Sequence, residues 1–501
     1  MSMTPPDATK LERSLEEELQ AIAPRPRPAL LGEVMRRVAS TPQRSTTRFA
    51  GWRLTGFAAA AVAGILVGAS ATLLVADRPD SRPPPSGASA PPSPAGAPAT
   101  TPAVSSEPSA ALPTSVAAIE WEMLDLPDPA EGMLGGGRPE AVVVVDGGYV
   151  AIGTLEAGCV SDITEAPPGC EELLMGLTAG FEYRSAVVWT STDGRAWEPV
   201  ANEPTFERAG MHDAATDGSR VIVTGEIQDP PDELGTAPGR SVVWLSDDGR
   251  TWELVDTGQP VPEHVAWTGN GYVGSLNTEA GPQFLTSDDG RAWQVTGEPG
   301  DHGQGRLEDM VADPATGAVV AVGYQEVVNA EGLLDSSSAA AWRSLDGQSW
   351  ERAPDQDALV VGPPGGAYMF AVAHTGSGWV ALGRADNDGA YDSGAWTSAD
   401  GLAWTRLRGR DSPIGADTYA NAITWTGSEL VAFGTISGRG GSTVAAWVSA
   451  DGSEWSSVPE QPGLSDGSPT AVTSHRGTIL AVGIRSSFTD HWVPVVYLAE
   501  P

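Results

Sequence analysis

The pattern Ser-x-Asp-Gly-x-x-Trp occurs six times in this chain of 501 residues. Its aspartates follow one another at steps of 55, 41, 57, 54 and 51 residues. They are Asp193, Asp248, Asp289, Asp346, Asp400 and Asp451. A repeat of this period predicts an array of similar structural units, each of which buries its apolar face against its neighbours.

Short alternating apolar segments flank the copies of the pattern, such as Val187-Val188-Trp189 before the first copy and Trp197-Glu198-Pro199-Val200 after it. Two such segments around Asp-Gly predict a β-hairpin. The Ser and Asp side chains can accept hydrogen bonds from the backbone of the turn, and Gly adopts a positive φ at little cost. The Trp ring then covers the hairpin and buries a large area.

A second hairpin precedes each turn and occurs seven times, first as Gly148-Tyr149-Val150-Ala151-Ile152-Gly153. A unit with two hairpins has four strands, as in a propeller blade. The last unit lacks its fourth strand, and residues 119–124 can supply it and close the ring without an exposed edge. The sequence therefore predicts an all-β, seven-bladed β-propeller. The third unit is short and carries Leu276 where the others carry Gly, and an irregular unit would change the count to six or eight.

The repeated turn resembles the Asp-box, or BNR, repeat of sialidases and related propellers. That family's pattern is Ser-x-Asp-x-Gly-x-Thr-Trp, whereas here Gly follows Asp directly in every copy. The resemblance implies a propeller fold and, as one possible activity, sialidase-like glycoside hydrolysis by a Tyr–Glu pair beside three Arg residues. The family's Arg-Ile-Pro segment is absent from this sequence, and the sequence assigns no residue to catalysis.

Four segments follow one another along the chain. Residues 54–76 carry no charge over 23 positions, which is long enough for a transmembrane helix. A cleaved signal peptide is the alternative, but 53 residues precede this segment. The Arg excess before it predicts a cytoplasmic N-terminal segment, 1–53, with short helices. Residues 77–117 are rich in Pro, Ala and Ser and predict a disordered stalk, and 118–501 form the propeller outside the cell membrane.

The two cysteines, Cys159 and Cys170, lie in one segment of the first unit and predict a disulfide in an oxidising compartment. Two free thiols are the alternative. The chain holds 65 acidic and 29 basic residues, and most of the acidic excess lies in the propeller. This balance argues against a nucleic-acid partner, because phosphate binding needs Lys and Arg.

Long loops held by a rigid scaffold usually carry function. Here the predicted long loops all lie at one end of the ring, at residues 154–185, 226–240, 325–338, 384–393 and 436–442. One of them carries Asp386, Asp388 and Asp392, an oxygen-rich group that can bind Ca²⁺ or form a solvated turn. No other metal or cofactor is predicted.

The fold and its long loops favour one hypothesis for the function: the propeller is a non-catalytic module that binds a protein or a cell-envelope glycan through its long-loop end. A sialidase-like surface glycosidase is the alternative, and a sensor that signals through residues 1–53 is a third hypothesis.

Overall fold

The computed structural model describes most of the chain that follows the predicted stalk. The described residues are 116, 119–127, 134–158, 182–200, 203–229, 239–256, 260–296, 304–328, 334–360, 366–387, 390–407, 414–415, 417–438, 441–486 and 492–500. None of them forms a helix with the length and apolar character needed to span a bilayer. The predicted transmembrane segment 54–76 lies outside the described residues, as do residues 1–53 and nearly all of 77–117.

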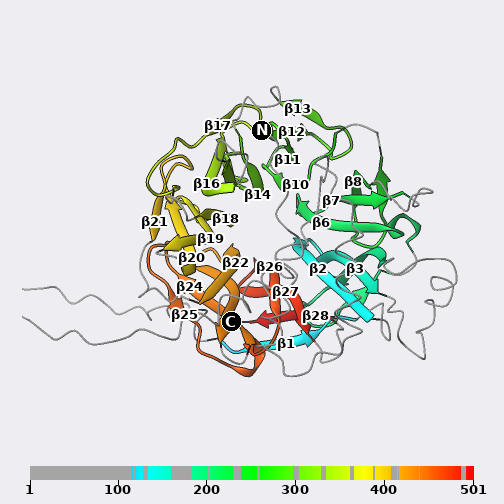
Figure 1. Ribbon diagram of the computed structural model, residues 1–501. Helices are drawn as coiled ribbons and strands as arrows, with labels where there is room; N and C mark the ends of the chain where they lie inside the picture. Colours follow the sequence, from blue (N-terminus) through cyan, green and yellow to red (C-terminus); the bar gives the residue numbers. More distant parts are fainter. Residues whose placement is uncertain are drawn as a thin grey trace, which may run out of the picture. The chain divides into compact units, whose positions relative to one another are not determined.

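Seven four-stranded antiparallel sheets form a ring (Figure 1). We number these blades 1 to 7 along the chain, starting with the sheet that holds β2. The innermost strands are β2 (Leu134–Val145), β6 (Ala209–Thr216), β10 (His264–Trp267), β14 (Arg306–Ala312), β18 (Ala367–His374), β22 (Thr418–Trp425) and β26 (Ser468–His475). The second strands are β3 (Gly148–Gly158), β7 (Val221–Gln228), β11 (Tyr272–Thr278), β15 (Val319–Val328), β19 (Trp379–Asn387), β23 (Leu430–Gly438) and β27 (Thr478–Ser486).

The third and fourth strands of each blade complete the sheets towards the outside. The third strands are β4 (Glu182–Ser191), β8 (Gly239–Ser246), β12 (Gly281–Ser287), β16 (Leu334–Ser344), β20 (Ala390–Ser398), β24 (Gly441–Ser449) and β28 (Trp492–Ala499). The fourth are β5 (Glu198–Pro199), β9 (Glu253–Val255), β13 (Gln294–Thr296), β17 (Trp350–Arg352), β21 (Thr405–Leu407), β25 (Ser456–Ser457) and β1 (Trp121–Asp125). Two 3-10 helices, η2 (Pro204–Phe206) and η3 (Pro462–Leu464), lie between blades.

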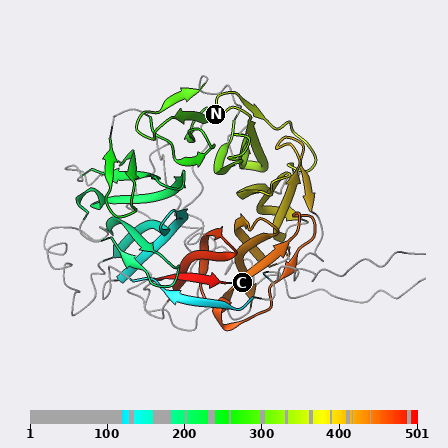
Figure 2. The ribbon, with the colours of Figure 1, turned by 180° about the vertical axis from the view of Figure 1, so that it is seen from behind.

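The N-terminal strand closes the ring, as the sequence predicts. β1 pairs with β28 over five residue pairs, from Trp121–Ala499 to Asp125–Val495. In Figures 1 and 2 the cyan β1 lies beside the red β28, although nearly the whole propeller separates them in sequence. The seven-bladed propeller and its closure are therefore confirmed.

The apolar core lies between adjacent blades. A tryptophan from the third strand occupies this layer in five blades and is fully buried there: Trp189, Trp244, Trp342, Trp396 and Trp447. Each hydrophobic cluster combines residues of two neighbouring sheets, such as Val431 and Ala446 of blade 6 with Ile479 and Val495 of blade 7. Each blade therefore depends on its two neighbours to cover its apolar faces.

A bulge interrupts the innermost strand in six blades, where one residue is left out of the pairing with the second strand. The bulged residues are Glu140, His212, Glu308, Phe370, Asn421 and Thr470. A glycine lies opposite each bulge, and a Cβ there would come within 1.9–2.3 Å of an innermost-strand carbonyl oxygen: Gly153, Gly225, Gly323, Gly383, Gly434 and Gly483. Blade 3 has Leu276 at this position, and its short innermost strand pairs without a bulge.

The segments that link the second and third strands are shorter than predicted. The predicted loop 384–393 is mostly strand, because β19 continues to Asn387 and β20 begins at Ala390. In the same way β23 and β24 leave only two residues between Gly438 and Gly441. The long-loop interpretation of these two segments was wrong, since polar residues there continue the pairing of a hairpin that extends beyond the ring.

Candidate binding site at the inner strands

The six predicted turn aspartates lie between the third and fourth strands of blades 1 to 6. In blade 1 the N–H of Gly194 donates to Ser191 Oγ (2.8 Å), and the N–H groups of Arg195 and Ala196 donate to Asp193 Oδ1 (2.8 and 2.9 Å). Trp197 Nε1–H donates to the Gly194 carbonyl (2.8 Å), a bond that sequence reasoning missed and that the other five turns share. These aspartates therefore shape the turns.

The same hydrogen bonds make the turns sensitive to acid. Backbone N–H donors lower the pKa of Asp193 and Asp400 below the usual carboxyl value. The stability that these carboxylates contribute is therefore present above the ordinary carboxyl pKa and is lost as the pH falls below about 4. We expect Asp400→Asn to lower Tm at neutral pH, with the difference from the wild type shrinking towards pH ~3. Thermal melts of both proteins over this pH range measure the difference in Tm. A difference that does not change with pH would contradict the role of the Asp400 carboxylate charge in the turn.

The other predicted site residues are placed only in part. Cys159 and Cys170 lie outside the described residues, so the disulfide remains a prediction. Asp386 belongs to β19 and pairs with Tyr391, and Asp392 belongs to β20 and pairs with Ala385, whereas Asp388 is not described. Within the described part of the chain, no three His, Cys, Asp or Glu residues are placed to hold a metal ion. The Ca²⁺ site remains a prediction as well.

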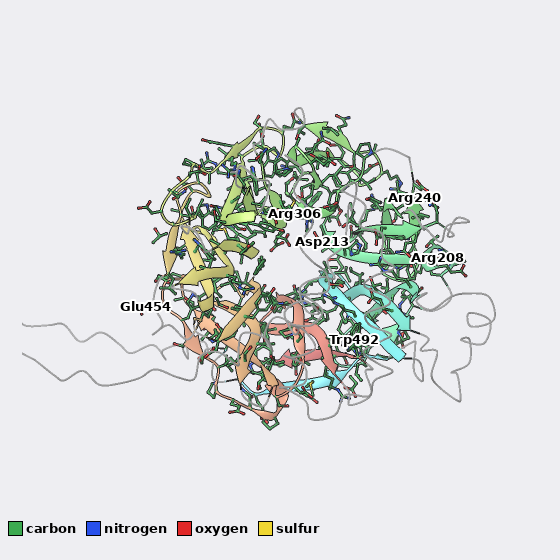
Figure 3. The ribbon with its side chains drawn as sticks, in the orientation of Figure 1. Arg208, Asp213, Arg240, Arg306, Glu454 and Trp492 are labelled. Carbon is green, nitrogen blue, oxygen red and sulfur yellow. The ribbon has the colours of Figure 1, made fainter. Side chains whose placement is uncertain are left out.

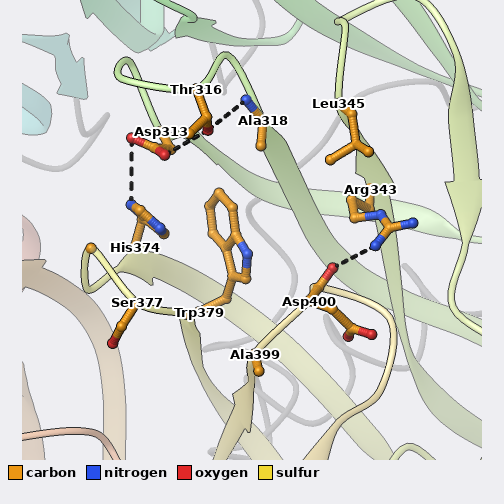
Figure 4. A pocket seen from close by; sticks show the side chains of 12 residues that line it. Asp313, Thr316, Ala318, Arg343, Leu345, His374, Ser377, Trp379, Ala399 and Asp400 are labelled. Carbon is orange, nitrogen blue, oxygen red and sulfur yellow. Dashed lines mark hydrogen bonds and ion pairs between the residues drawn. The ribbon is translucent and has the colours of Figure 1, made fainter.

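A pocket of about 270 Å³ lies between blades 4 and 5, at the end of the ring that carries the Asp-Gly turns (Figure 4). Its polar groups are already paired. Asp313 accepts a hydrogen bond from Thr316 Oγ1 (2.6 Å) and lies 3.9 Å from His374 Nδ1, and Arg343 Nη1 donates to the Asp400 carbonyl (3.0 Å). Since these groups satisfy one another, the pocket offers a ligand few unpaired polar partners.

Four aromatic rings form a continuous row at the opposite end of the propeller, where the innermost strands begin. We call Tyr324, Tyr368, Phe370 and Tyr419 the inner aromatic row. Successive ring centroids lie 4.9, 6.1 and 5.7 Å apart. The row crosses blades 4, 5 and 6, and Tyr419 is 38% exposed while the other three rings are half-buried. Aromatic side chains on a rigid sheet form strong contacts at little entropic cost.

Charged groups of both signs flank the row. Glu308, the bulged residue of β14, lies 3.9 Å from Arg306 Nε, and Figure 3 shows Arg306 at the inner edge of the ring. Burial, followed by the charge of Glu308, raises the pKa of Tyr324 to about 12. Burial and Glu308 also raise the pKa of Tyr419, and Arg384 opposes this shift. Both phenols are therefore neutral hydrogen-bond donors at physiological pH.

Sequence reasoning missed the inner aromatic row, although a signal was present. The members of the row are up to 95 positions apart, and only ring closure brings them together. The repeated glycines of the second strands allow the sequences of the blades to be aligned with one another. Counting from each glycine, Phe370 occupies the same bulge position as Glu308, and Tyr368 and Tyr419 both lie two residues before a bulge.

The fold and the site define a seven-bladed β-propeller with an aromatic surface at one end of its inner strands. No protein-family model matches the chain, and no curated protein matches its sequence. Similar solved structures include YCF48 bound to D1 peptide, with 14% identity over 76% of this chain and 97% of that chain (TM-score 0.44).

Sialidases are also among the structural neighbours. Phage phi92 endosialidase is 12% identical over 76% of this chain and 69% of that chain (TM-score 0.43). A mutant of Trypanosoma rangeli sialidase displaying trans-sialidase activity is 13% identical over 72% of this chain (TM-score 0.37). This chain covers 54% of that enzyme.

Proposed function

We propose that the propeller is a non-catalytic module that binds a protein or a cell-envelope glycan through the inner aromatic row. Residues 54–76 would anchor it in the cell membrane, with the propeller outside. The observation that carries the proposal is the row itself, four neighbouring rings from three blades, of which Tyr419 is 38% exposed and the other three are half-buried. Rigid strands hold these rings in place, so a ligand binds them without a large ordering cost.

The chemistry around the row suits recognition of a polar ligand. Glu308 and the hydroxyls of Tyr324 and Tyr419 offer acceptors and donors beside the ring faces, and Arg306 and Arg384 add donors of opposite charge. The Tyr368 hydroxyl already donates to Ser337 Oγ (2.7 Å). An apolar surface with a few placed polar groups is typical of binding sites, where the polar groups set orientation and specificity.

Catalysis by a tyrosine nucleophile fits this site less well. A phenol becomes a better nucleophile when its surroundings lower its pKa, whereas Tyr324 and Tyr419 have raised values. The site therefore favours binding over sialidase-like hydrolysis.

A glycan array and a pull-down from cell envelopes, run with the full-length chain in detergent, test the proposal. We expect Tyr419→Ala to weaken retention of the captured ligand by about 30-fold or more, as for a central aromatic contact. Leu345→Ala is the matched control, because Leu345 is an apolar residue 64% exposed at the other end of the ring. Equal retention by both variants would place the ligand elsewhere.

A panel of fluorogenic glycosides, run beside the binding assays, distinguishes the binding module from the alternative, a sialidase-like glycosidase. We expect no turnover. Hydrolysis that is abolished by replacing one carboxylate, Glu308→Gln for example, would overturn the binding-module proposal.

A further inference from the structure

One repeat position is ionisable in three consecutive blades and alanine in the other four. It is the residue that pairs with the position directly before the repeated glycine of the second strand, or before Leu276 in blade 3. Where the innermost strand has a bulge, this residue comes directly after it. Blades 1, 5, 6 and 7 carry Ala141, Ala371, Ala422 and Ala471 there. Blades 2, 3 and 4 carry Asp213, His264 and Asp309. Because equivalent positions lie at the same level of a ring, these three side chains are neighbours across two blade junctions.

Both carboxylates tie their blade to the next one. Asp213 Oδ2 accepts the N–H of Val265 in blade 3 (3.0 Å) and lies 3.7 Å from His264 Nδ1. Asp309 Oδ2 accepts the N–H of Val372 in blade 5 (2.8 Å). Figure 3 shows Asp213 at the inner edge of the ring. One carboxylate therefore binds across the junction of blades 2 and 3, and the other across the junction of blades 4 and 5.

These carboxylates are not neutralised by arginine. In the part of the chain that the structure describes, no Arg side chain forms an ion pair with Asp213 or Asp309. Burial, and then the charge of Asp213, raise the pKa of Asp309 to about 7, and the N–H of Val372 and the imidazole of His264 oppose this shift. The other ionisable groups on its own strand, on β15 and on the adjacent innermost strand β18 are Arg306, Glu308, Tyr324, Glu326, Tyr368 and His374.

We propose that Asp213, His264 and Asp309 form a proton-sensitive junction that loosens blades 2 to 5 when Asp309 loses its proton. With the proton bound, Asp213 carries the only carboxylate charge of this group of three. Without it, two half-buried carboxylates without an arginine partner lie on neighbouring inner strands, and their charges repel. Since the folded chain holds this proton more tightly than the unfolded chain, the folded state is favoured on the acidic side of neutrality, and stability declines as the pH rises through the pKa of Asp309.

Thermal unfolding of the full-length chain in detergent, followed by tryptophan fluorescence, tests the proposal. We expect the wild-type Tm to fall by a few degrees as the pH rises from about 4, the ordinary carboxyl pKa, to about 7, and to level off above it. Asp309→Asn keeps an acceptor oxygen for the Val372 N–H and removes the charge, so its Tm should not fall over this range and should exceed the wild-type Tm at high pH. Parallel pH profiles for the two proteins would overturn the proposal.

Two further measurements remain decisive even if Asp309→Asn does not fold. Asp213→Asn removes the neighbouring charge, so we expect it to move the wild-type transition to lower pH. Infrared difference spectra of the wild type should show a protonated carboxylic acid band that disappears near neutral pH. A wild type without such a band, or an unmoved transition in Asp213→Asn, would rule out the proton-sensitive junction.

Discussion

Replacing Trp121 with alanine is expected to lower the free energy of unfolding by about 3–5 kcal/mol, as for other buried tryptophans. Trp121 is 3% exposed and meets Phe433 of blade 6 edge to face, with ring centroids 4.9 Å apart. It is the first residue of β1, the strand that closes blade 7. Its loss therefore removes core volume and weakens the only strand that joins the two ends of the ring in the described chain.

Denaturant unfolding followed by fluorescence measures this loss, with Met123→Ala as the matched control. Met123 belongs to the same strand and is half-buried, so its truncation removes less apolar area. We expect the Trp121 variant to lose at least twice as much free energy of unfolding as the Met123 variant. Equal losses would mean that ring closure depends on the backbone pairing of β1 with β28 and not on the tryptophan.

The sequence was sufficient to predict the ring because its turns are built from local interactions. Ser191 and Asp193 accept hydrogen bonds from N–H groups two or three positions away, so their identity and spacing determine the turn. The closure followed from a count of strands, since a unit without a fourth strand needs one from elsewhere in the chain.

The bulges were missed because their signal is spread over two strands. Gly383 has an ordinary place in a strand pattern, and only its approach to the Tyr368 carbonyl shows why no side chain fits there. Leu276 identifies the third unit as irregular. The structure shows why a side chain is tolerated there: the short β10 has no bulge, so no glycine is needed opposite it. The hairpin ends were missed for a different reason: polar residues such as Asp386 and Asn387 are typical of loops, yet here they pair as strands.

The candidate site could not be read from the sequence, since each of its blades contributes only one or two residues. Nothing in Tyr419 alone distinguishes it from a core tyrosine. It becomes part of a surface because Phe370 of the preceding blade lies 5.7 Å from its ring. Such contacts depend on how blades meet, and blade contacts have no local signature along the chain.

The glycine of each Asp-Gly turn has a second role, between blades, and this gives the second prediction. Gly452 has φ +83°, and a Cβ there would lie 2.6 Å from Val380 Cγ2 of blade 5. In all six turns the nearest side chain that such a Cβ would meet belongs to the preceding blade, or to blade 7 in the case of Gly194. Gly452→Ala should therefore cost about 1–2 kcal/mol for the left-handed backbone and about 1–3 kcal/mol for overpacking.

Gly427→Ala separates these two costs. Gly427 lies in another turn of blade 6 with φ +99°, and a Cβ there would meet no atom within 4 Å. We expect it to lose only the backbone share, about 1–2 kcal/mol, in the same denaturant experiment. The difference between the two variants measures how tightly blade 6 is packed on blade 5. If the variants are equally destabilised, the turn glycine is required for its φ alone, and the close packing of blades depends on the buried tryptophans instead.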